Sequence, residues 1–93
     1  MFHFLEAFQA ATQALGVEPA MAREPVLRTA AGALEQTGLG EAFGALRARV
    51  TSKRGTTEAA LAVLDARAMP QALGAAVQAA YARAAELSRE LSA

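Results

Sequence analysis

Apolar residues recur along residues 2–15 at the spacing of one helix face. They follow one another at steps of four, three and four, as Phe4, Phe8, Ala11 and Leu15. Gly16 comes directly after the last of them, where a glycine lets the chain turn left-handed at a helix end without steric strain. The pattern therefore predicts a first helix that stops at Gly16.

A second helix is predicted from Pro19 onward. Proline suits the first turn of a helix, because its missing N–H would have no partner there. The helical spacing then continues through Leu27, Ala31 and Leu34. Pro25 lies too deep to belong to the first turn. Two alternatives follow, a helix kinked near residues 21–22 or a helix that begins near Arg23.

Three glycines, at positions 38, 40 and 44, indicate a connection before a short helix of about residues 41–50. Residues 51–57, TSKRGTT, have no apolar periodicity, and the helical segment TEAALAVLDA overlaps their end. Thr56 or Thr57 is the predicted N-cap of this helix, because a hydroxyl there accepts a hydrogen bond from a free amide of the first turn. Glu58 favours the same helix end through the helix dipole.

The last predicted helix covers residues 70–91. Its apolar positions alternate steps of four and three, which is typical of a coiled-coil seam, and they are Leu73, Val77, Ala80, Ala84, Leu87 and Leu91. A helix with such a seam needs a long partner. No segment of the chain alternates apolar and polar residues as a strand would, so the predicted fold class is all-α, in a single domain of residues 1–93.

Composition adds that the core is thin. Alanine accounts for 26 of the 93 residues and aromatic residues for five, so much of the apolar content buries little area per side chain. A chain of this size buries too little of its surface on folding to be stable as a monomer. We expect an oligomer.

Charge and residue usage exclude several classes of function. Nine basic and nine acidic residues are spread along the chain, so no nucleic-acid partner is expected. The chain has no cysteine and one histidine, so we expect no metal site, and His3 and Glu6 are interpreted as a surface or interface pair. The longest apolar run, residues 59–64, is far below the roughly 20 residues of a membrane span. We expect no membrane association and a cytoplasmic location.

The loop of residues 51–57 is the candidate binding site. Hydroxyls, free amides, the cations Lys53 and Arg54 and a helix N-terminus come together there, a combination that suits carboxylate or phosphate. The same residues also fit an ordinary helix cap followed by solvated charges, and the residue types alone favour that reading. No glycine-rich fingerprint for a dinucleotide occurs, so no cofactor is expected on this chain.

The loop and its flanking helices resemble a known family. LRARVTSKRGTTEAALAVL, AVQAAYARAAELSREL and the opening FHFLEAFQAATQALGV are similar to the C-terminal domain of pyrroline-5-carboxylate reductase, whose loop usually reads T-S-P-G-G-T-T or T-S-K-G-G-T-T. The resemblance covers nearly the whole chain. It implies a small helical dimerisation domain of the kind that ends 6-phosphogluconate dehydrogenase, an interleaved homodimer, and possible rings of dimers.

The resemblance also implies a function. Enzymes of that family reduce pyrroline-5-carboxylate to proline with NADPH or NADH, which a separate Rossmann domain holds. By position, Ser52, Gly55 and Thr56 would belong to the turn whose amides grip the substrate carboxylate. The hydroxyl of Thr57 would face the ring nitrogen and act in catalysis. The family's cofactor domain precedes the segment that matches this chain from Met1 onward, so the chain alone is expected to be inactive.

Arg54 departs from the family pattern, because it stands at the first glycine of the pair. If the position requires a positive φ, arginine costs on the order of 1 kcal/mol and crowds the site. Alternatively, its guanidinium grips the substrate carboxylate directly. Two other functions stay open beside the reductase domain, a stand-alone helical assembly module and a small anion-binding protein without catalysis.

Overall fold

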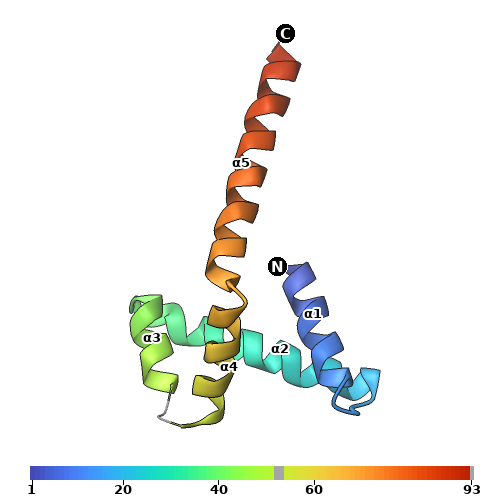
Figure 1. Ribbon diagram of the computed structural model, residues 1–93, viewed down its shortest axis with the longest axis vertical. Helices are drawn as coiled ribbons and strands as arrows, with labels where there is room; N and C mark the ends of the chain where they lie inside the picture. The colour runs from blue at the N-terminus through green and yellow to red at the C-terminus, as the bar shows by residue number, and fades with distance from the viewer. Residues whose placement is uncertain (52–53, 93) are drawn as a thin grey trace. The chain divides into compact units, whose positions relative to one another are not determined.

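The computed structural model describes residues 1–51 and 54–92, and this part of the chain contains helices and no strand (Figure 1). The predicted all-α class is therefore confirmed. In chain order the elements are α1 (Phe2–Gln13), α2 (Pro19–Gln36), the 3-10 helix η1 (Thr37–Leu39), α3 (Phe43–Val50), α4 (Thr56–Ala66) and α5 (Met69–Ser92). The chain divides into two compact units, Met1–Arg49 and Val50–Ala93, which are described separately.

In the first unit, α1 ends close to the predicted place. The helix stops at Gln13, and Gly16 has a φ of +96°, so the predicted left-handed turn at this glycine is confirmed. The chain then returns, so that α2 packs beside α1 (Figure 1). Gln9 of α1 joins the two helices, because its Nε2 donates a hydrogen bond to the carbonyl of Pro19 at 3.3 Å.

Helix α2 begins at Pro19 and contains Pro25 in its interior. The alternative start near Arg23 is therefore wrong. The carbonyl of Glu18 accepts hydrogen bonds from the amides of Met21 and Ala22, both at 2.9 Å, so the first turn is already closed before Pro25 is reached. Pro25 then removes one hydrogen bond from the interior of the helix without ending it.

Little of the chain is buried. In the described part, the buried side chains are Ala22, with no exposed surface, and Val26, at 4% exposure, both on α2. Phe4 and Phe8 contact each other edge to face along α1, with ring centroids 6.2 Å apart, and both are exposed. The first unit therefore has a contact layer between two helices rather than a core.

The connection to α3 uses one of the predicted glycines. Gly40 follows η1 with a φ of +80°, a conformation that glycine adopts without strain. Helix α3 begins at Phe43, two residues after the predicted start at Glu41. Glu41 instead pairs with Arg49 at the far end of α3.

In the second unit, α5 continues away from the end of α4 instead of folding back along it (Figure 1). It has 24 residues, close to the predicted range, and therefore a length of about 36 Å. None of its described residues is buried, and the seam positions Leu73, Val77 and Leu91 are 60%, 61% and 88% exposed. The described residues of the second unit, 50–51 and 54–92, do not cover this seam.

The turn between α4 and α5 contains a strained residue. Ala68 has a φ of +57°, where an L side chain costs roughly 1 kcal/mol. We predict that Ala68→Gly raises the free energy of unfolding by up to about 1 kcal/mol. Ala62→Gly, in the middle of α4, is the matched control and should lower it by about 0.5–1 kcal/mol. Urea unfolding followed by circular dichroism measures both, and a less stable Ala68→Gly protein would contradict the strain.

Candidate functional site

The predicted loop lies at the start of the second unit, directly before α4. Arg54 and Gly55 are described, whereas Ser52 and Lys53 lie outside the described residues. Arg54 is exposed, Gly55 is half-buried, and α4 follows at once with Thr56. The described part of the site is therefore one turn of chain and the first turn of one helix.

Arg54 has a left-handed backbone, with a φ of +60°. Position 54 therefore has the positive φ that the sequence analysis considered. A glycine would take this conformation without strain, whereas arginine takes it at a cost on the order of 1 kcal/mol. The backbone N–H of Arg54 donates a hydrogen bond to Oε2 of Glu58 at 3.1 Å. The side chain of Glu58 thus reaches back from the first turn of α4 to the turn before it.

The N-cap of α4 is Gly55, with a φ of −87° and a ψ of 177°, and it makes no side-chain cap hydrogen bond. The prediction that Thr56 or Thr57 caps the helix is therefore wrong. Gly55 takes the extended conformation that an N-cap needs, and both threonines already belong to the helix. Thr56 is exposed and Thr57 is half-buried.

This arrangement leaves the helix N-terminus available to an anion. The first amides of a helix have no partner within the helix, and the helix dipole adds partial positive charge at the same end. No hydrogen bond is seen from the amides of Gly55, Thr56 or Thr57 to any of the described residues. Glu58 places a negative charge nearby, which an incoming carboxylate must tolerate.

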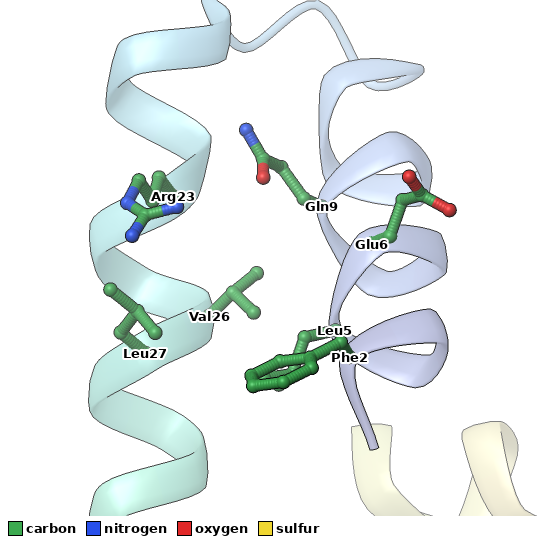
Figure 2. A pocket seen from close by; sticks show the side chains of 7 residues that line it. All are labelled: Phe2, Leu5, Glu6, Gln9, Arg23, Val26 and Leu27. Carbon is green, nitrogen blue, oxygen red and sulfur yellow. The ribbon is translucent and has the colours of Figure 1, made fainter.

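A hollow lies in the first unit, between α1 and α2 (Figure 2). Its volume is about 330 Å³, and its lining consists of Phe2, Leu5, Glu6, Gln9, Arg23, Val26 and Leu27. Phe2 and Leu5 of α1 point toward α2, and Val26 points back toward α1 (Figure 2). The lining is apolar with a few polar groups at its edge, so it suits an apolar side chain better than a charged ligand. The sequence analysis did not identify this hollow.

Other candidate chemistry stays at the surface. His3 and Glu6 approach to 3.8 Å with both side chains exposed, which agrees with a surface pair. In residues 1–51 and 54–92, no group of three or more His, Cys, Asp or Glu side chains is placed to hold a metal ion. No helix in these ranges is long and apolar enough to cross a membrane.

Helices that bury almost nothing, together with a long exposed seam, define a helical assembly domain. Residues 1–87 match the family described as pyrroline-5-carboxylate reductase dimerisation, and the chain belongs to this family. The resemblance drawn from the loop and its flanking helices is thereby confirmed.

Two reductases show the extent of the similarity. The chain is 40% identical over 88 residues to the pyrroline-5-carboxylate reductase of Haemophilus influenzae, covering 92% of this chain and 32% of that protein. It is 37% identical over 91 residues to the enzyme of the same name from Pseudomonas aeruginosa, covering 97% of this chain and 33% of that protein. The chain thus spans about a third of the length of these relatives. No solved structure matches it.

Sequence reasoning missed the bond between Glu58 and Arg54. A signal for it existed, because a glutamate at the third position of a helix is known to reach back to amides before the helix. The sequence analysis instead assigned the capping position to Thr56 or Thr57, whereas Gly55 occupies it.

Because neither threonine caps α4, we predict that Thr56→Ala and Thr57→Ala change the free energy of unfolding by less than about 0.5 kcal/mol. Loss of a hydroxyl cap typically costs about 1 kcal/mol. Thermal unfolding of the two variants beside the parent chain provides the measurement. A loss of 1 kcal/mol or more in either variant would show that its hydroxyl does cap the helix.

Proposed function

We propose that this chain is the dimerisation and substrate-binding domain of a pyrroline-5-carboxylate reductase, and that it forms a homodimer whose helices interleave. Support for the dimer comes mainly from α5, a helix of 24 residues without a buried side chain. Isolated helices are marginal in water, and helical stability in proteins comes mostly from packing of an apolar face. The family to which the chain belongs is named for dimerisation.

The seam of α5 is compatible with a copy of itself. In order, its positions are Leu73, Val77, Ala80, Ala84, Leu87 and Leu91, so two large residues stand at each end and two small ones in the middle. When two such helices cross antiparallel about a two-fold axis, alanine faces alanine at the closest approach and large residues meet on either side. This symmetry favours a second copy of the chain over an unrelated helix.

For the loop, we propose that the amides near Gly55 and Thr56 hold the carboxylate of pyrroline-5-carboxylate or proline. The hydroxyl of Thr57 then lies beside the ring nitrogen and orients it. NADPH or NADH, held by another domain of the whole enzyme, supplies the hydride that reduces the imine carbon, and the nitrogen gains a proton. The supporting observations are the amides at the α4 N-terminus and the family membership.

The guanidinium of Arg54 extends from an exposed position of the same turn. Its charge is suited to attracting the substrate carboxylate toward the amides. Since Arg54 and Thr56 are exposed in this chain, ligand affinity of the domain alone is expected to be weak, and turnover is expected to require the cofactor domain.

The dimer is tested at Val77, one of the large residues of the apolar seam. We predict that Val77→Glu weakens self-association by about 100-fold or more, because each of two protomers loses roughly 1.5 kcal/mol of apolar burial and gains a buried charge. Gln78→Glu adds the same charge on the polar face of α5 and should leave association unchanged. Light scattering over a wide concentration range measures the mass, with circular dichroism on the same samples. A parent chain that stays folded and monomeric would overturn the interleaved dimer.

The substrate loop is tested in a chimera that joins this chain to the remainder of the Pseudomonas aeruginosa reductase. We expect imine-dependent oxidation of NADPH or NADH by the chimera and none by the chain alone. Thr57→Ala should lower kcat by about ten-fold, the effect of one lost positioning hydrogen bond. Thr56→Ala should not, because this residue contributes its backbone amide. A chimera that dimerises without activity would favour the assembly module instead.

A further inference from the structure

We propose that Glu58 is a positioning residue for the loop before α4: its carboxylate holds residue 54 in the left-handed conformation and thereby fixes the amides of Gly55 and Thr56. The part of this inference that concerns a ligand rests on the proposed function of the loop. The part that concerns the loop itself rests on the geometry at Arg54 and Glu58 alone.

The hydrogen bond between Glu58 and Arg54 closes a short ring around the helix start. Oε2 of Glu58 accepts from the Arg54 N–H at 3.1 Å, and the chain between them contains Gly55, Thr56 and Thr57. A closed ring restricts the directions in which the enclosed amides point. The residues proposed to bind the substrate carboxylate are thus those that the ring encloses.

This hydrogen bond, which we call the clamp, acts on a strained part of the backbone. Arg54 has a φ of +60°, which L side chains adopt with strain, and its exposed side chain brings no packing that would offset it. Gly55 caps α4 without a side-chain hydrogen bond. The side chain of Glu58 bonds the backbone of this turn at the Arg54 N–H.

Charge and hydrogen bonding at Glu58 have separable effects. The carboxylate that clamps the turn also lies at the helix end where an anionic ligand would bind, so its charge opposes the ligand while its bond orders the site. Glu58→Gln keeps an oxygen acceptor and removes the charge. Glu58→Ala removes both. A residue that acted only through the helix dipole would respond alike to both changes.

The experiment uses the full 93-residue chain, labelled for NMR, with L-proline as the probe. Glu58→Ala should lower the 15N order parameters of the Gly55 and Thr56 amides, from about 0.85 toward 0.6, and weaken proline binding by about ten-fold. Glu58→Gln should keep the order parameters of the parent chain and bind proline at least as well. Glu24→Ala, which removes an exposed carboxylate of α2, is the control for loss of one charge.

The decisive variant combines Glu58→Ala with Arg54→Gly. Glycine adopts the left-handed turn without strain, so this double variant should regain the order parameters of the Gly55 and Thr56 amides, and proline binding, although the carboxylate is absent. A merely stabilising acid at a helix N-terminus would not be rescued by a change at residue 54. Unchanged order parameters in Glu58→Ala, or no recovery of them in the double variant, would overturn the positioning role.

The two readouts separate this inference from the proposed function. If the order parameters change as expected but no variant binds proline at millimolar concentration, the clamp stands and the substrate loop is refuted. If all variants bind proline equally with unchanged order parameters, the substrate loop stands and the clamp is refuted.

Discussion

The exposed apolar seam of α5 is the constraint on which the rest of the structure depends. A helix of 24 residues with no buried side chain has little tertiary packing to hold it, and helix propensity alone is marginal in water. Full burial of Leu73, Val77, Leu87 and Leu91 is worth roughly 6–12 kcal/mol per protomer before the costs of association are subtracted. That amount is comparable to the whole stability of a small domain. Covering this seam is therefore the step that makes the fold stable.

The small side chains also limit how much surface a single copy of the chain can bury. In the first unit, Ala22 and Val26 form the whole buried layer among the described residues, and a hollow of about 330 Å³ lies beside them between α1 and α2. A chain with 26 alanines gains stability mainly where backbones come close, and one copy provides few such places. Membership in a family defined by dimerisation agrees with this physical requirement.

The sequence predicted most of the helices and one of their stops, but not the details of the site. Periodicity located α1, α2, α4 and α5, and Gly16 took the predicted left-handed turn, because these signals are local and strong. The cap of α4 was predicted wrongly, since hydroxyl and glycine N-caps compete closely and the choice depends on where the preceding turn begins. The positive φ of Ala68 has no sequence signal, because glycine, asparagine and aspartate are the residues that favour this conformation and alanine is not among them. Whether the loop binds a carboxylate stays a prediction.

Helix α4 connects assembly to the proposed binding loop. It is bounded by two non-glycine residues in the left-handed conformation, Arg54 before it and Ala68 after it, and each costs on the order of 1 kcal/mol. An 11-residue helix cannot offset this strain by itself, since helices of that length are marginal alone. The free energy that keeps α4 in place must come from packing, and in this unit α4 packs against α5. Whatever covers the seam of α5 therefore also steadies α4, and with it the turn at Arg54 that presents the loop amides.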